Sequence, residues 1–334
     1  MRDAGNPADD TPKTETDRLE AAVPRVENRP KVLALVGPTA VGKSAFAIEL
    51  ARKFGGEVIN ADSMQLYQGM DIGTAKPPPE ARREIVHHLL DIWPVTKTAS
   101  VAEYQRLARA AITSVTARGA LPILVGGSGL YVRAALDRLE FPGTDPGIRA
   151  RWEAELARVG PLALHRELAR RDPQAAAGIL PTNGRRIVRA LEVLDLGRPR
   201  FTATMPGYES VYDVLLIGLD RETSALDLRV EQRVAEMWAA GFVEEVRRLA
   251  DTCGLRRGLT ASRALGYRQV LEMLDGRHSE AQARELTVAA TKRFVRRQRS
   301  WFRADPRVQW WDAADPELVD RLARTIEVWT TSPS

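Results

Sequence analysis

The stretch Lys31-Val-Leu-Ala-Leu-Val-Gly37-Pro-Thr-Ala-Val-Gly-Lys43-Ser44 decides the fold of this chain. Its first six residues are mostly apolar and predict a buried strand, and the next eight fit the pattern G-x-x-x-x-G-K-[ST]. Glycines in this pattern let backbone N–H groups turn inward, and the helix that follows brings the positive end of its dipole. The stretch therefore predicts a phosphate-binding loop between a strand and a helix, with Lys43 adding a full positive charge.

Short apolar runs elsewhere predict further strands, which alternate with helical patterns in the first part of the chain. These strands are expected at 57–62, 88–92, 122–125 and 214–217, with a last one at 308–311. Alternating strands and helices indicate an α/β fold with a parallel sheet. The expected fold class is thus a P-loop NTPase-like parallel sheet core.

The strand signals disappear between residues 132 and 207, where Arg, Ala, Leu and Glu recur at helical spacing. This pattern predicts an all-helical domain inserted into the core. Residues 1–29 show no apolar period, which indicates a disordered tail. The core is expected to comprise 30–131 and 208–334, and its later part should hold helices at 222–250, 262–274 and 279–303.

Composition excludes several classes of protein. The 334 residues are 44% hydrophobic and 28% charged, as in ordinary soluble proteins, and no uncharged apolar run is long enough to span a membrane. The single cysteine, Cys253, cannot form an internal disulfide, which fits a reducing, cytoplasmic compartment. The net charge of +5 allows a polyanionic partner without requiring one.

Asp62 ends the second predicted strand. Because ligands gather at the carboxyl ends of parallel strands, its side chain is expected near the phosphate loop. There it could hold a metal-bound water or act as a general base; a polar cap at the strand end is the alternative interpretation. A P-loop kinase or NTPase normally carries a further acid after a strand for Mg²⁺, but Pro122-Ile-Leu-Val-Gly-Gly127 ends without one.

Two segments after the loop, Asp62-Ser-Met-Gln-Leu-Tyr67 and Gly69-Met-Asp-Ile-Gly-Thr-Ala-Lys-Pro77, make the sequence resemble the tRNA dimethylallyltransferase family, also called tRNA isopentenyltransferases or IPP transferases. The likeness continues through Val125-Gly-Gly-Ser-Gly-Leu-Tyr131 and Arg297-Gln-Arg-Ser-Trp-Phe-Arg303 and covers roughly residues 31–311. Family members transfer a dimethylallyl group from dimethylallyl diphosphate to N6 of the adenosine at tRNA position 37, beside the anticodon. The resemblance implies an enzyme, a tRNA prenyltransferase, whose phosphate loop holds a leaving group.

On the donor side, the resemblance implies a site that neutralises departing diphosphate. Its departure leaves positive character on the allylic carbon and negative charge on the bridging oxygen. The diphosphate is expected at Gly37, Pro38, Thr39, Ala40, Val41, Gly42, Lys43 and Ser44, through backbone amides 38 to 44, with Mg²⁺ as the cofactor at Ser44. Lys43, Thr39 and Arg233 are expected to act in catalysis; a solvated helix face is the other interpretation of Arg233.

On the acceptor side, an exocyclic adenine amine is a weak nucleophile, so a carboxylate that accepts its proton assists attack. Asp62 resembles that base, and Ser128 stands where most relatives carry threonine, with its hydroxyl expected near the amine. The base must leave its stack, and the insertion and arginine clusters must hold the anticodon stem-loop. Contacts with tRNA are expected at Asp62, Ser63, Met64, Gln65, Ser128, Arg149, Arg185, Arg186, Ile187, Val188, Arg189, Arg263, Gly266, Tyr267, Arg268, Arg296, Arg297 and Arg303.

The residues themselves leave alternatives open. Six positive and no negative side chains in 292–303 also fit a solvated helix face. A P-loop small-molecule kinase would bind ATP at the same loop with Asp62 on Mg²⁺, and a pure RNA-binding module would not need Lys43. His87 and His88 lack Cys or acidic residues at ligand spacing and are expected to pack or cap, and the pair Trp310-Trp311 is expected in the core. The preferred hypothesis is a cytoplasmic monomer with tRNA and dimethylallyl diphosphate as partners and no membrane contact.

Overall fold

A computed structural model describes residues 29–203 and 205–332, so the predicted tail lies almost entirely outside the described residues. They form a six-stranded parallel sheet in the order β3-β2-β4-β1-β5-β6. The strands are β1 (Lys31–Val36), β2 (Gly56–Asn60), β3 (His87–His88), β4 (Leu121–Gly126), β5 (Asp213–Asp220) and β6 (Gln309–Asp312). The predicted α/β class is confirmed, although the strand expected at 88–92 is only the two-residue β3.

Both faces of the sheet are covered by helices, so β1 is apolar and buried on both sides from Val32 to Val36. Val32, Ala34 and Val36 belong to one hydrophobic core, while Leu33 and Leu35 belong to the other, and all five are fully buried. The first core includes α4 and α5, and the second includes α2 and α13. Five of the described helices lie around the sheet at the start and the end of the chain. They are α2 (Lys43–Phe54), α3 (Pro79–Glu84), α4 (Val101–Ala117), α5 (Gly129–Leu136) and α13 (Leu318–Thr331).

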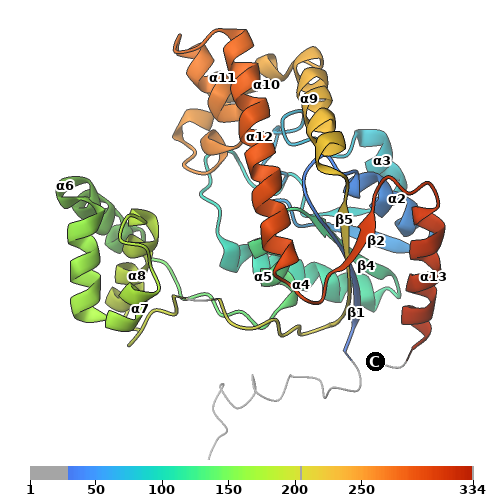
Figure 1. The fold of residues 1–334 in the computed structure, drawn as a ribbon, viewed down its shortest axis with the longest axis horizontal. Coiled ribbons are helices and arrows are strands. Elements are labelled where there is room, and N and C mark those ends of the chain that lie inside the picture. Colours follow the sequence, from blue (N-terminus) through green and yellow to red (C-terminus); the bar gives the residue numbers. More distant parts are fainter. Residues whose placement is uncertain (1–28, 204, 333–334) are drawn as a thin grey trace, which may run out of the picture.

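A second group of helices packs beyond one end of the sheet (Figure 1). It contains α9 (Thr223–Ala239), α10 (Phe242–Thr252), α11 (Tyr267–Leu274), α12 (Glu280–Arg303) and the short 3-10 turns η2 (Leu255–Arg257) and η3 (Ala261–Arg263). The helix predicted at 222–250 is in fact two, because Gly241 takes a left-handed φ of 89° between them. The helix predicted at 262–274 begins only at Tyr267, after Gly266 with a φ of 82°. Among the described residues, no helix combines the length and apolar character needed to cross a membrane.

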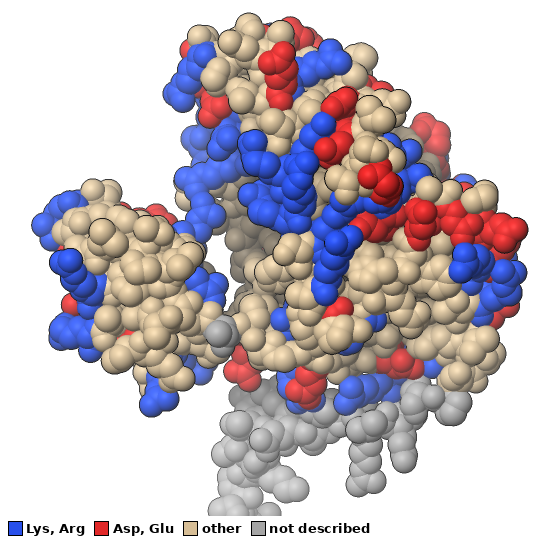
Figure 2. All heavy atoms as spheres, viewed as in Figure 1, with Lys and Arg blue, Asp and Glu red and all other residues tan. Residues whose placement is uncertain are grey.

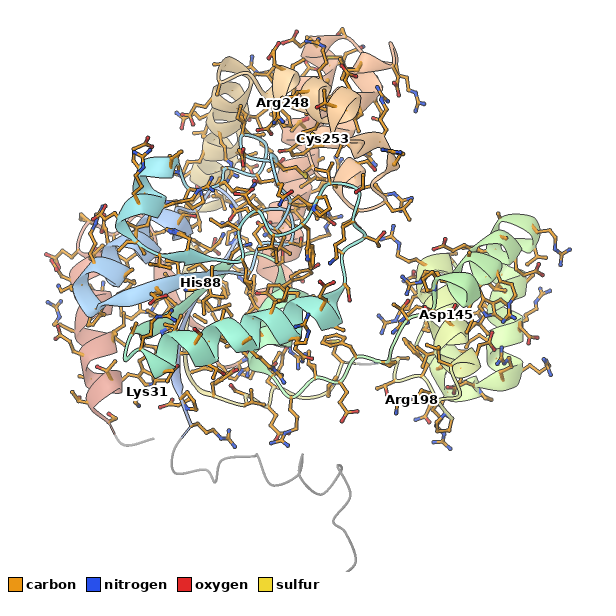
Figure 3. All side chains as sticks on the ribbon, turned by 180° about the vertical axis from the view of Figure 1, so that it is seen from behind. Lys31, His88, Asp145, Arg198, Arg248 and Cys253 are labelled. Atoms are coloured by element: carbon orange, nitrogen blue, oxygen red, sulfur yellow. The ribbon has the colours of Figure 1, made fainter. Side chains whose placement is uncertain are left out.

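Three helices form a separate unit with its own hydrophobic core, which includes Leu164, Leu168, Ile187 and Leu191. They are α6 (Pro146–Arg171), α7 (Pro173–Ala177) and α8 (Gly184–Asp195). Figure 1 shows this unit to one side of the sheet, and in Figure 3 Asp145 and Arg198 lie on its side nearest the sheet. The insertion was expected from residue 132, but residues 132–136 belong to α5 and pack in the main core, so the helical unit starts later.

A cluster of buried charged side chains holds together the two chain segments that connect the helical unit to the sheet. The fully buried Asp137 accepts hydrogen bonds from Arg133 Nε at 2.7 Å and Arg307 Nη1 at 2.6 Å. Arg133 Nη2 also donates to the carbonyls of Pro206 and Gly207 at 2.9 and 2.8 Å. The cluster pairs its buried charges, and it ties the outgoing chain after α5 to the returning chain before β5.

Candidate functional site

The chain after β1 wraps into a loop that only glycine permits at its start. Gly37 has a φ of 139°, and a Cβ at this residue would lie 2.2 Å from the carbonyl oxygen of Leu219. Lys43 Nζ donates to the carbonyls of Gly37 at 3.0 Å and Pro38 at 2.8 Å. The ammonium group is thus held inside the loop, at the positive N-terminus of α2.

A cavity of about 390 Å³ opens in front of this loop. Its walls come from the loop, the end of β2, the segment 74–77 and α9. The polar side chains among its lining residues are Thr39, Lys43, Ser44, Asn60, Asp62, Gln65, Thr74, His87, Arg229, Gln232, Arg233 and Glu236. The predicted base therefore borders one space with most of the predicted donor-side residues, namely Thr39, Ala40, Gly42, Lys43, Ser44 and Arg233, whereas Gly37, Pro38 and Val41 are not among its lining residues.

Asp62 lies two residues beyond β2 in a turn built by Asn60. Asn60 Oδ1 accepts from the backbone N–H of Asp62 at 2.8 Å, and Asn60 Nδ2 donates to the carbonyls of Asp62 and Leu89, both at 3.0 Å. Asp62 Oδ1 accepts from the backbone N–H of Met64 at 2.9 Å. These contacts fix the direction of the Asp62 carboxylate at the cavity wall.

Two cations face this carboxylate. Burial lowers the pKa of Lys43 from 10.5 to about 8, and the positive charge of Arg233 adds to that shift while the negative charge of Asp62 opposes it. Burial likewise lowers the pKa of Arg233, again opposed by Asp62. Arg233 Nη1 donates to Thr39 Oγ1 at 2.9 Å, and Nη2 to the carbonyl of Thr74 at 3.3 Å. The interpretation of Arg233 as part of a solvated helix face is therefore wrong.

Glu245 on α10 supports the chain segment that leads into the cavity wall, and no sequence motif pointed to it. Its Oε2 accepts from the backbone N–H groups of Asp71 and Ile72 at 3.0 and 2.8 Å. Its Oε1 accepts from Tyr267 Oη at 2.6 Å, and Glu245 is only 7% exposed. This buried acceptor orders the segment that continues into the wall beside Arg233.

Gln298 on α12 was also missed, and it corrects the picture of the phosphate loop. The backbone N–H of Thr39 donates to Gln298 Oε1 at 2.9 Å, and Gln298 Nε2 donates to the carbonyl of Gly127 at 2.8 Å. The Thr39 amide is therefore engaged with the protein, Pro38 has no N–H, and the Val41 side chain is fully buried. Not every residue expected to bind diphosphate can thus present a group to the cavity.

Ser128 joins the end of β4 to the Asp62 segment. Its Oγ accepts from the backbone N–H of Ser63 at 3.1 Å and lies 3.3 Å from Ser63 Oγ. Met64 packs partly against the main core. Ser128 and Ser63 thus lie beside the predicted base, whereas Met64 faces the protein interior in part.

Exposed cations gather on and around α12. Figure 2 shows Lys and Arg side chains concentrated over this helix, towards the helical unit. All five arginines predicted in this region to contact tRNA are exposed: Arg263, Arg268, Arg296, Arg297 and Arg303. A surface of this kind suits a polyanion.

Three residues near this surface are interior and correct the prediction. Gly266 is buried and Tyr267 is fully buried, with its hydroxyl donated to Glu245. Arg299, counted within the cationic run, is 8% exposed and donates through Nε to Asp220 Oδ1 at 2.8 Å. These side chains support the fold and present little surface to a ligand.

The tRNA contacts predicted in the helical unit differ in exposure. They are Arg149, Arg185, Arg186, Ile187, Val188 and Arg189. Ile187 and Val188 are 0% and 3% exposed in the core of the unit, so their prediction as tRNA contacts is not supported by their position. Arg149 and Arg189 pair with the buried Glu192 at 2.7 and 2.8 Å and remain partly exposed. Arg185 is exposed, and the Arg186 guanidinium lies 5.9 Å from the ring of Phe201.

The two neighbouring histidines have partners other than a metal. His87 Nδ1 lies 2.7 Å from a backbone carbonyl, and His88 Nε2 lies 2.6 Å from Glu57 Oε2. Nowhere in the described part of the chain do three or more His, Cys, Asp or Glu side chains gather as metal ligands would. Trp310 is 37% exposed, so its expected place in the core is wrong, while Trp311 packs partly against the core.

Fold and site together define a P-loop α/β protein with a cavity lined by Lys43, Arg233 and Asp62 and an arginine-rich surface beside it. A family model described as IPP transferase matches residues 65–305. The chain belongs to the IPP transferase family, as its motifs indicated.

Individual relatives agree with this assignment. A tRNA dimethylallyltransferase of Acidothermus cellulolyticus is 72% identical over 304 residues, covering 91% of this chain and 96% of the relative. One of Thermobifida fusca is 61% identical over 295 residues, with 87% and 92% covered. The crystal structure of a tRNA isopentenylpyrophosphate transferase of Bacillus halodurans is similar at a TM-score of 0.67 and 38% identity, covering 90% of this chain and 98% of that one.

Proposed function

We propose that this protein is a tRNA prenyltransferase that moves the dimethylallyl group of dimethylallyl diphosphate to N6 of adenosine 37 and releases diphosphate. One observation carries the proposal: the phosphate loop and Asp62 border the same cavity, beside an arginine-rich helix. The two relatives are named tRNA dimethylallyltransferase, and the match covers 96% and 92% of their length. Their names support prenyl transfer to tRNA.

Lys43 and Arg233 serve the donor. Both cations line the cavity, so they neutralise the negative charge that grows on the bridging oxygen as the carbon–oxygen bond breaks. The exposed hydroxyl of Ser44 lines the same cavity and, with water and phosphate oxygens, offers the oxygen ligands that Mg²⁺ takes. Bound there, Mg²⁺ would add positive charge next to the leaving group.

Asp62 serves the acceptor. As the adenine nitrogen forms its bond to the allylic carbon, its proton passes to the Asp62 carboxylate. The contact with the Met64 amide holds that carboxylate at the cavity wall before the base arrives. Ser128, whose hydroxyl accepts from the amide of Ser63 next to Asp62, is the second group that bonds to the base.

The exposed arginines of α12 and the helical unit hold the anticodon stem-loop by its phosphates, with the target base turned out of its stack. This arrangement needs no membrane and no second copy of the chain. We therefore propose a cytoplasmic monomer.

The test supplies labelled dimethylallyl diphosphate or ATP, each with and without unmodified tRNA. We expect label to reach tRNA only from the prenyl donor. Turnover of ATP without RNA, with no prenyl transfer, would support the small-molecule kinase instead and overturn the proposal.

Asp62→Ala tests the role of the base. Loss of a general base slows a reaction by about 10² to 10⁴-fold, so the rate of prenylation should fall by a factor in that range. The melting temperature and the tRNA affinity should stay close to wild type. The exposed Asp251→Ala is the matched control and should retain the wild-type rate. A wild-type rate for Asp62→Ala would remove Asp62 from the mechanism.

A further inference from the structure

Gln298 lies where α12 meets both the phosphate loop and the end of β4. Its side chain is 4% exposed, accepts from the Thr39 amide at 2.9 Å and donates to the Gly127 carbonyl at 2.8 Å. A carboxamide offers an acceptor and a donor on one rigid group, whereas a carboxylate offers acceptors only. One side chain thus spans the gap between two loops that are far apart in sequence.

The glycines after β4 let α12 approach closely. A Cβ at Gly127 would lie 2.2 Å from Gln298 Nε2, and one at Gly129 would lie 2.1 Å from ring atoms of Trp301. Two side chains one turn apart on α12 therefore sit directly on the segment that carries Ser128. Because Gly127 and Gly129 have no side chains, the contacts of Gln298 and Trp301 set the distance between α12 and this segment.

Each end of the Gln298 bridge leads to a residue of the proposed site. Thr39, on one side, accepts the hydrogen bond of Arg233 through its hydroxyl. Ser128 follows Gly127 on the other side and bonds to the amide of Ser63. A displaced Gln298 would change the distance between the groups that hold the donor and those that border the acceptor.

The same helix carries exposed arginines. Arg297 adjoins Gln298 in sequence and points to solvent, as does Arg296. A polyanion bound to these cations is therefore bound to the helix whose opposite face holds the phosphate loop. Binding of a polyanion and placement of the phosphate loop therefore both depend on the position of α12.

We propose that Gln298 is a positioning residue for prenyl transfer: it sets the phosphate loop against the Ser128 segment and ties both to the arginine-bearing helix. This inference rests on the proposed function. Gln298 touches no substrate in this role and acts only through the groups that it positions. Its loss should therefore lower kcat and weaken donor binding, while tRNA binding through the exposed arginines is retained.

Two variants and a control test the proposal. Gln298→Leu removes both hydrogen bonds, and Gln105→Leu removes one bond of a glutamine on α4, donated to the Leu139 carbonyl away from the site. With all proteins folded at the assay temperature, Gln298→Leu should lose about tenfold to 10²-fold in kcat, since a shift of reacting groups by about 1 Å can cost about 10²-fold, and its tRNA Kd should be unchanged. Gln105→Leu should keep wild-type kcat.

Gln298→Glu gives a readout that general destabilisation would not produce. Ionised, it accepts from Thr39 but repels the Gly127 carbonyl; protonated, it can donate to that carbonyl as glutamine does. Its kcat divided by that of wild type should therefore rise as pH falls, while the ratio for Gln298→Leu stays flat. This variant also keeps the test open if Gln298→Leu does not fold.

Wild-type kcat in Gln298→Leu, or a pH-independent ratio for Gln298→Glu, would overturn the proposal. If the wild-type protein itself transfers no prenyl group, the proposed function fails instead. The position of the loop then remains testable, because Gln298→Leu should still weaken binding of inorganic pyrophosphate.

Discussion

The charge on Lys43 should decide how tightly the phosphate loop holds a diphosphate ester, and pH controls that charge. Burial lowers the pKa of Lys43 to about 8, so about nine-tenths of the amines are charged at pH 7 and about one-tenth at pH 9. A bound anion favours the charged form. The Kd for a diphosphate ester should therefore rise roughly tenfold between pH 7 and pH 9, or about 1.4 kcal/mol.

The effect of the same group on stability has the opposite sign. Lys43 titrates near 8 in the folded chain and near 10.5 when exposed, so between these values the unfolded chain binds more protons. The contribution of Lys43 to the free energy of unfolding therefore rises with pH in this window and is lowest below pH 8. Weaker binding at pH 9 cannot then be a consequence of a less stable Lys43 site.

Calorimetric titration with a non-hydrolysable allylic diphosphate at pH 7, 8 and 9 measures the effect. Lys43→Arg is the control, because a guanidinium stays charged over this range and should give a flat profile. Lys43→Met should bind weakly at every pH. An equal pH slope in wild type and Lys43→Arg, or a wild-type Kd that does not change from pH 7 to pH 9, would refute the reasoning.

Three further substitutions separate stability from binding. Glu245→Gln replaces one buried acceptor with an NH₂ group facing backbone donors, and should cost about 2 kcal/mol in urea unfolding. Arg299→Ala breaks the pair with Asp220 and should also cost about 2 kcal/mol, yet leave tRNA affinity near wild type, since Arg299 is 8% exposed. Arg297→Ala should do the reverse, with unfolding changed by less than about 0.5 kcal/mol and the salt dependence of tRNA binding reduced by about one phosphate contact.

The parts of the site that the sequence could predict depend on local geometry. The apolar run of β1, the glycines of the loop and the lysine at the start of α2 are adjacent in the chain, so their pattern alone specifies the cradle. Asp62 was predictable because parallel strands bring their carboxyl ends to one edge. These features required no knowledge of which distant segment packs on which.

Glu245 shows what such patterns leave out. It stands three residues after Phe242 and four before Leu249, on the buried stripe of α10, where an acid is out of place. The spacing therefore signals that Glu245 needs partners. Besides the Tyr267 hydroxyl, its partners are backbone groups more than 170 residues away in the chain, at Asp71 and Ile72, and no local rule identifies them.

The cationic run 292–303 makes the same point about a surface. A count of charges treats it as one face, whereas the helical period divides it: Val295, Gln298, Arg299 and Phe302 are buried, and Arg297 is exposed. Two of these four buried positions hold polar side chains where packing alone would favour apolar ones, and buried polar groups require partners. Gln298 meets the phosphate loop, and Arg299 meets the end of β5. A polar residue that interrupts the buried stripe of an amphipathic helix is thus a sequence signal for a place where that helix supports a site, even though its partner can be identified only from the structure.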